Sequence, residues 1–323
     1  MKIPAINIFG NYNIGCPATS KGGKNNYADN QQKRQSVSFG VNYTKSDLIY
    51  RSSILYHKAN IIKTTPSKVE EYFRQQGIPA FFQEGSDFAR KMVAYCCYHT
   101  SEIFSQLHYI KPKQIGIADF RRLNSDATGL CFYGPSMYSR TETYPARAVL
   151  FNTFAGDKKS NVEGKNIVLD WENFFDISME NKKNNFLSSG HFLSPFIHEF
   201  AHSLHYHKIF SKFGVPFNDP AYIYNPNSQI ILDKLNMKLD NTNPYVSSSI
   251  VKNIAQNISQ YGAILLPETF AEAFTKAVLE HIDVFSLRLI ENPFPMKNNG
   301  NNILNQVLYE TFEGLVGDGA GLI

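Results

Sequence analysis

The segment SPFIHEFAHSLHYH, residues 194–207, constrains the fold of this chain more than any other stretch. Its opening Ser-Pro pair combines a good N-cap with a residue pre-set for the first helical position, so we predict a helix from Ser194 to about Phe213. His198 and His202 lie four residues apart and therefore on one face of that helix. This spacing lets two imidazoles reach one metal ion, whereas the ordinary interpretation is an amphipathic helix that is rich in histidine.

The residue that follows His198 completes a His-Glu-x-x-His motif. Glu199 lies one position round the helix, where it can hydrogen-bond a metal-bound water instead of ligating the ion. About 0.01 chance matches are expected in a chain of this composition, so the motif is informative. His205 lies on the same face but another turn away, and we predict that His205 and His207 are flanking or surface residues.

A third ligand is required, because a catalytic zinc site has three protein ligands and one open position. The segment QYGAILLPETFAEAFTKAVLEH, residues 260–281, contains a helix that we predict to begin at Pro267. Glu268 and Glu272 lie four residues apart on it. Glu268 can be the third ligand, and Glu272 can hydrogen-bond the far nitrogen of a ligating histidine. Such a pair is usually two solvated carboxylates, but its apolar neighbours indicate packed surroundings.

Tyr261 precedes Glu268 by seven residues. A phenol at this position could donate to the oxyanion of a tetrahedral intermediate. Taken alone, it would be a structural residue, since the chain has 18 tyrosines.

The three segments HEFAH, QYG and ETFAEAF together resemble the lethal-factor-like peptidases, a family of gluzincin metalloproteases. That family carries His-Glu-Phe-Gly-His, then Tyr-Gly, then Glu-x-Phe-Ala-Glu-Ala-Phe, with the same step of seven residues from Tyr to Glu. The match covers about twenty residues. This chain departs from the pattern at Ala201, where the family has Gly, and in a longer insert between the two helices.

The resemblance implies one Zn²⁺ per chain, with His198, His202 and Glu268 as ligands. It also implies Glu199 as the general base and Tyr261 as the stabiliser of the transition state. Glu272 would then orient a ligating histidine.

The function expected from these roles is zinc-dependent hydrolysis of peptide bonds in a protein or peptide substrate through a zinc-activated water. The resemblance also suggests a secreted toxin or effector. Two alternatives stay open: a catalytically silent zincin-fold binding protein with structural zinc, and a metal-free helical adaptor.

The order of predicted elements indicates an α+β fold. Helices are predicted at 67–77 and 86–110, and mainly helices follow the connection at 181–185. Between them lie predicted strands, at 114–120, 129–134, 146–153 and 166–171. We expect a zincin-like, two-lobed metalloprotease with a small mixed sheet, an active-site helix and a mainly helical C-terminal lobe. An extended peptide substrate is expected beside 129–134 or 146–153.

The N-terminal part is expected to lie outside this domain. Residues 11–40 are dominated by Asn, Gln, Ser, Gly and Lys, which offer too few apolar side chains to offset ordering entropy. We therefore predict a polar flexible tail over 1–65, with 41–65 transitional, and a zincin-like domain over 66–323.

The composition is that of a soluble protein and narrows the range of partners. The net charge of +4 comes from scattered Lys and Arg and gives no argument for nucleic acid. No apolar run is long enough for a membrane span, so no stable membrane insertion is expected. The N-terminus is a poor Sec signal, which leaves export by another route or a cytoplasmic location. The four cysteines, Cys16, Cys96, Cys97 and Cys131, are expected to be reduced thiols, and the oligomeric state is open.

Overall fold

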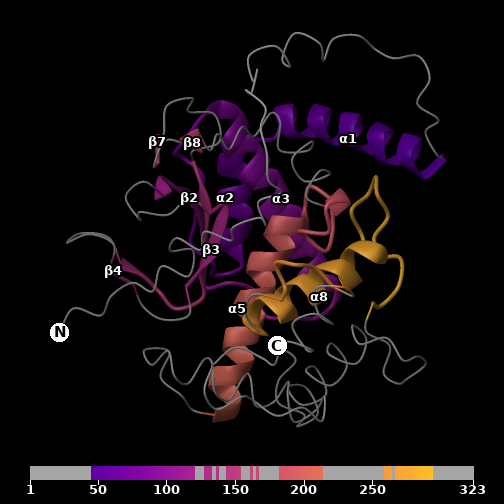
Figure 1. The fold of residues 1–323 in the computed structure, drawn as a ribbon. Coiled ribbons are helices and arrows are strands. Elements are labelled where there is room, and N and C mark those ends of the chain that lie inside the picture. Colours follow the sequence, from indigo (N-terminus) through magenta and orange to yellow (C-terminus); the bar gives the residue numbers. More distant parts are fainter. Residues whose placement is uncertain are drawn as a thin grey trace.

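The computed structural model of the chain combines helices with a small mixed sheet (Figure 1). It confirms an α+β arrangement, with five helices and one four-stranded sheet among the described residues. None of these helices has both the length and the apolar composition that a membrane span requires. The residues that the structure describes are 45–120, 127–132, 136–137, 143–153, 161–162, 165–166, 182–213, 256, 258–263 and 266–293.

The sheet has the strand order β1-β2-β6-β3, with β1 at Ala80–Phe81, β2 at Gln114–Ala118, β6 at Ala148–Asn152 and β3 at Gly129–Cys131. The first three strands are parallel, and β3 runs antiparallel to β6. All five residues of β6 are buried, as expected for a strand paired on both sides and covered on both faces. Among the described strands, β3 therefore forms one edge of the sheet.

Two short hairpins lie outside this sheet. They pair β4 (Ser136–Met137) with β5 (Thr143–Tyr144), and β7 (Asn161–Val162) with β8 (Lys165–Asn166). The strand predicted at 166–171 falls outside the described residues except for its first residue, which lies in β8. The three other predicted strands correspond to β2, β3 and β6.

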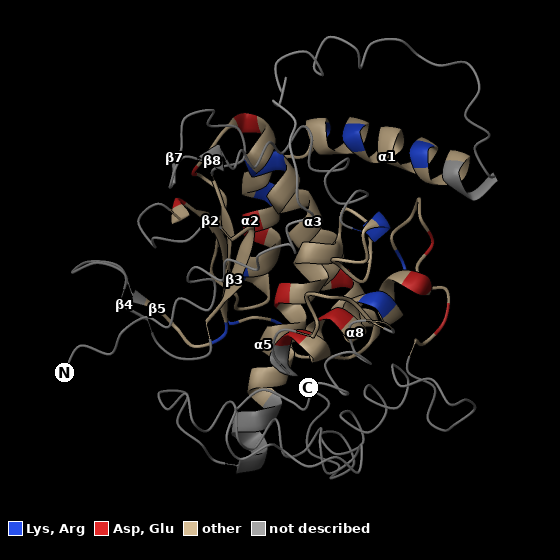
Figure 2. Ribbon diagram, viewed as in Figure 1, with Lys and Arg blue, Asp and Glu red and all other residues tan. Residues whose placement is uncertain are grey.

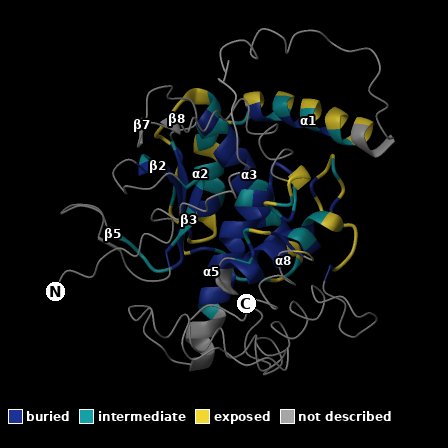
Figure 3. Ribbon diagram, viewed as in Figure 1, coloured by how far each residue is buried: buried dark blue, intermediate teal, exposed yellow. Residues whose placement is uncertain are grey.

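Helices α2 (Pro66–Gln75) and α3 (Asp87–Gln106) begin within one residue of the predicted starts, and α3 ends four residues before the predicted end at 110. Gly77 follows α2 with φ of +73°, a left-handed conformation that a glycine adopts without strain. The Ser86 hydroxyl caps α3 by accepting a hydrogen bond of 3.1 Å from the Ala89 N–H. Met92, Val93, Cys96 and Ile103 place one side of α3 in the core, and Figure 3 shows the buried part of this helix.

Helix α5 (Ser194–Phe213) spans the predicted range and packs between the sheet and α8 (Leu266–Glu280). The ring centroid of Phe196 lies 4.4 Å from that of Phe151 on β6. One turn further along α5, Phe200 contacts Phe104 of α3 with ring centroids 5.3 Å apart. Buried aromatic pairs of this kind hold a helix firmly in place. Figure 2 shows acidic residues gathered where α5 and α8 meet, although the surroundings are apolar.

The predicted tail over 1–65 is wrong for its last part, because helix α1 spans Lys45–Lys63. One face of α1 packs on α3: Ile61 lies in the core, and the His57 ring nitrogen Nδ1 lies 2.8 Å from the Tyr95 hydroxyl. Burial of this face supplies the free energy that orders the helix. Residues 1–44 lie outside the described residues.

The cysteines in the described part of the chain are free thiols. Cys96 and Cys97 are fully buried in α3, and Cys131 is partly buried in β3. These three confirm the expected reduced state, whereas Cys16 lies outside the described residues.

Candidate metal centre

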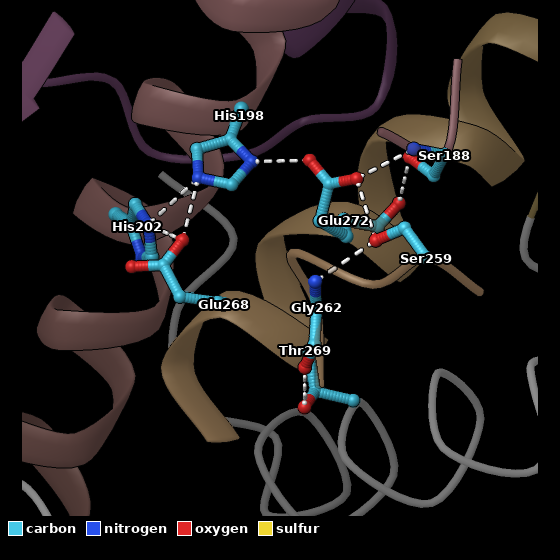
Figure 4. A network of polar contacts seen from close by, with 8 residues as sticks. All are labelled: Ser188, His198, His202, Ser259, Gly262, Glu268, Thr269 and Glu272. Atoms are coloured by element: carbon cyan, nitrogen blue, oxygen red, sulfur yellow. Dashed lines mark hydrogen bonds and ion pairs between the residues drawn. The ribbon is translucent and has the colours of Figure 1, made fainter. Parts of the chain in front are cut away.

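Three predicted ligands from two helices converge on one point (Figure 4). His198 Nε2 lies 2.9 Å from Glu268 Oε2 and 3.0 Å from His202 Nε2. His202 Nε2 lies 3.3 Å from the same Glu268 oxygen. All three side chains are buried, with exposed fractions of 5–6%. Helix α5 supplies both histidines from one face, and the first turn of α8 supplies the carboxylate.

The donor set fits a divalent metal ion. Two imidazole nitrogens and a carboxylate oxygen direct lone pairs at one another, and this arrangement is repulsive unless a proton or a cation lies between them. Ligand atoms 2.0–2.1 Å from a tetrahedral ion lie about 3.3 to 3.4 Å from one another. The three separations at this site, 2.9 to 3.3 Å, are within a few tenths of that spacing. The group is therefore a candidate metal site, and among the described residues it is the one cluster of this kind.

Glu272 holds the ring of His198 from the other side. Its Oε1 lies 2.9 Å from His198 Nδ1, so the ring donates there and Nε2 is the nitrogen available to a metal ion. Glu272 Oε2 accepts hydrogen bonds from the Ser188 N–H at 2.6 Å and from the Ser259 hydroxyl at 2.9 Å. The predicted role of Glu272 thus has the matching geometry, and the carboxylate is 1% exposed.

The charges of the cluster shift its pKa values in opposite directions. Burial alone would lower the pKa of His198, but hydrogen bonds and charge from Glu268 and Glu272 raise it well above its ordinary value. Burial would raise the pKa of Glu268, yet the neighbouring His202 and His198 hold it well below its ordinary range. Both directions are those expected of an ionised carboxylate beside histidines in a field that attracts a cation.

Glu199 occupies the next position of α5 and faces the edge strand. Its side chain lies against the backbone of Gly129, where an added Cβ would be 2.7 Å from Glu199 Cγ. Burial raises the pKa of the Glu199 carboxyl, while the nearby His198 charge and the Cys131 N–H act in the opposite direction. Such a carboxyl accepts a proton more readily than an exposed one does. The short distance from β3 fixes it beside the two histidines.

Tyr261 lies on the turn that precedes α8, next to the ligands. Its ring centroid is 5.7 Å from that of His198. Burial and the nearby carboxylates raise its pKa well above the ordinary value, so the phenol stays protonated. The turn is fixed by Ser259, whose hydroxyl accepts the Gly262 N–H at 2.9 Å, and by the Thr269 hydroxyl, which donates to the Gly262 carbonyl.

The prediction for His205 is wrong in part, because this residue is 1% exposed. The centroid of its ring lies 4.3 Å from that of Phe270 on α8, so His205 takes part in the interface between α5 and α8. It is absent from the ligand cluster because it lies one turn beyond His202. His207 is partly buried, and its Nδ1 lies 3.4 Å from the Arg147 guanidinium.

Sequence reasoning missed the residues that support the site. Ser188 lies in a loop without a motif, and its contact with Glu272 joins positions 84 residues apart. Ser259 directly precedes the quoted QYG segment, which was the one available signal. Gly129 was assigned to a strand, but nothing local revealed that Glu199 would lie against it.

Comparisons of the chain with protein-family models, curated proteins and solved structures gave no match.

Proposed function

We propose that this chain is a zinc-dependent endopeptidase of the zincin type. The observation that carries the proposal is the buried convergence of His198, His202 and Glu268, with Glu199 on the adjacent position of the same helix. When bound, Zn²⁺ would lower the pKa of a water and polarise a peptide carbonyl. A structural zinc site has four protein ligands, whereas the described residues offer three here, which favours a catalytic role.

Glu199 would act as the proton carrier. Its carboxyl has a raised pKa because it is desolvated, so it accepts a proton from an attacking water and passes it to the leaving amine. It lies against Gly129 and outside the ligand triad, so the proposed acid–base group and the proposed ligands are separate side chains.

Tyr261 would stabilise the negative charge that develops on the carbonyl oxygen. Its raised pKa keeps the phenol as a hydrogen-bond donor at neutral pH. A fixed donor costs no reorganisation in the transition state, and loss of one such donor typically slows turnover by about 10²–10³-fold. The contacts of Ser259 and Thr269 with Gly262 supply that rigidity.

The substrate would bind in an extended form along β3. Of the two runs considered from the sequence, β6 is paired on both sides, by β2 and by β3. An edge strand offers backbone groups to an added peptide strand. A peptide on β3 would pass Gly129 and so come within reach of Glu199. A complex with a peptide inhibitor that leaves β3 uncontacted would contradict this part of the proposal.

The proposal is tested with Glu199→Gln, which keeps the shape of the side chain and removes its basicity. Cleavage of a fluorogenic peptide library is measured for the wild type, for this variant and for Glu71→Gln, a change of the same kind at a partly exposed carboxylate of α2. We expect turnover to fall by about 10²–10⁴-fold in Glu199→Gln alone, with metal content unchanged. Wild-type turnover in Glu199→Gln would overturn the assignment. If turnover falls as expected, comparison of the protein N-termini generated by the wild type and by the variant would identify substrates.

A further inference from the structure

Helix α1 is apolar on two faces that lie about 100° apart around its axis, although only one of them is packed. The inner face carries Ile54 and Ile61, which contact the core through α3. The second face carries Leu48, Leu55 and Ile62, which are 52%, 70% and 61% exposed. These three residues are spaced by seven, so they form one stripe along the helix. Figure 3 shows exposed residues along the outer side of α1.

The stripe continues onto an adjacent segment of the chain. Tyr56 of α1 is 50% exposed, and Phe285 is 41% exposed. Their rings meet edge to face with centroids 5.9 Å apart. A soluble protein rarely leaves contiguous large apolar side chains on one face unless that face binds something. We call the set of Leu48, Leu55, Tyr56, Ile62 and Phe285 the outer face of α1.

The charges of α1 are strongly asymmetric. The helix contains four basic residues and one acidic residue, Asp47, which gives four minus one, or +3, out of the chain's net +4. At 100° per residue, Arg51 and Lys58 lie on one flank of the stripe and Lys63 lies on the other. Long basic side chains that border an apolar stripe can bury their stems while their charged ends reach phosphate groups. Figure 2 shows the Lys and Arg positions along α1.

We propose that the outer face of α1 binds the surface of an anionic lipid bilayer, with the helix lying in the plane of the interface. Leucine, isoleucine and aromatic side chains with flanking Lys and Arg are the pattern of interfacial helices. Each basic residue near an anionic leaflet adds electrostatic attraction to the surface. This surface activity is separate from peptide hydrolysis and does not depend on it.

A second copy of the chain is a poorer occupant of this face. Two copies of α1 would bring together helices that each carry +3. The positions between the large apolar residues are Ser52 and Ala59, which would give a helix pair a shallow and weak seam. Anionic headgroups neutralise the charge, and the acyl chains beneath them accept the apolar stripe without requiring a complementary seam.

The test is flotation of the full chain with vesicles of 70% phosphatidylcholine and 30% phosphatidylserine, beside vesicles of phosphatidylcholine alone. We expect binding to the mixed vesicles that is at least about ten-fold stronger and that weakens in 0.5 M NaCl. The triple variant Leu48→Ser, Leu55→Ser, Ile62→Ser should lose at least about ten-fold in binding. Its matched control, Phe81→Ser, changes an exposed aromatic residue on β1 and should bind like the wild type.

Each outcome decides the proposal. Because the altered residues are exposed, circular dichroism and the thermal midpoint should match those of the wild type. Equal binding to both vesicle types, no binding to either, or unchanged binding by the triple variant would overturn it. So would a dimer in light scattering that the triple variant abolishes, since the face would then bind a second copy.

Discussion

His198 and Glu272 form the contact on which the geometry of the candidate centre depends. Nδ1 of the ring and Oε1 of the carboxylate are 2.9 Å apart and both buried, although the residues are separated by 74 positions. The other oxygen of Glu272 is occupied by two donors, from Ser188 and Ser259. The carboxylate therefore fixes which nitrogen of His198 carries the proton and which faces Glu268.

Glu272→Gln should weaken zinc binding although it preserves shape. Ser188 and Ser259 both donate to one position, so the amide oxygen would take that position and the NH₂ group would face His198. The ring would then accept at Nδ1 and carry its proton at Nε2, toward the ligand site. We expect the zinc Kd to rise by about 10–100-fold. Competition with a fluorescent chelator measures it, and Glu280→Gln, exposed on the same helix, is the control. An unchanged Kd would show that the contact does not orient the ligand.

Ser259→Ala should loosen the turn that carries Tyr261. The hydroxyl donates to Glu272 and accepts the Gly262 N–H, so its loss leaves a buried N–H without its partner. We expect the free energy of unfolding to fall by about 1–3 kcal/mol in urea titrations. Ser203→Ala removes a buried hydroxyl that has no hydrogen-bond partner in the described part of the chain, and should cost little. Equal losses in the two variants would contradict the role given to Ser259.

Gly129→Ala should displace Glu199 without removing the ligands. The new Cβ would lie 2.7 Å from Glu199 Cγ, so the side chain or β3 has to move. We expect kcat for peptide cleavage to fall by at least about ten-fold, because a general base acts only from within hydrogen-bond reach. Zinc content should stay at the wild-type level. Loss of zinc together with activity would mean that the substitution disrupts α5 as a whole.

His99 and His191 should each cost the chain stability as the pH falls below about 6.5. Burial lowers the pKa of His99 to about 4 and that of His191 to about 3, with His57 and Arg288 adding to the shift of His99. Because the unfolded chain binds these protons near pH 6.5 and the folded chain does not, the free energy of unfolding falls through this range. At pH 5 each of these two histidines should cost about 2 kcal/mol relative to pH 7.5.

Denaturant titrations at pH 7.5 and 5 measure this loss for the wild type and for His99→Phe. Phenylalanine keeps the ring that packs between Tyr95 and Tyr98 but cannot take up a proton. The variant should lose about 2 kcal/mol less than the wild type between the two pH values. Identical losses would show that His99 is not held neutral by the fold.

The sequence predicted best those elements whose signals are local. The Ser-Pro start of α5 and the Ser86 cap of α3 are set by neighbouring residues, and both helices begin where predicted. Helix α1 was missed because its apolar residues lie on two faces and mimic an irregular pattern. The burial of His205 was missed because it depends on Phe270, which lies far along the chain.

The candidate site shows the same division. Spacing alone placed His198 and His202 on one face, and a second pattern supplied Glu268. Ser188 and Gly129 were beyond prediction, because their roles come from contacts between segments 84 and about 70 residues apart in the sequence. Long-range packing leaves no local signature from which such partners are found.

The most direct test of the account is the zinc content of the purified chain after chelation and reloading. Elemental analysis should find about one zinc per chain in the wild type and in Glu199→Gln, and far less than one in His202→Ala. That result would identify His202 as a ligand and separate Glu199 from the ligand set. A wild-type chain that binds no zinc, or a His202→Ala variant that keeps it fully, would contradict the proposed metal centre.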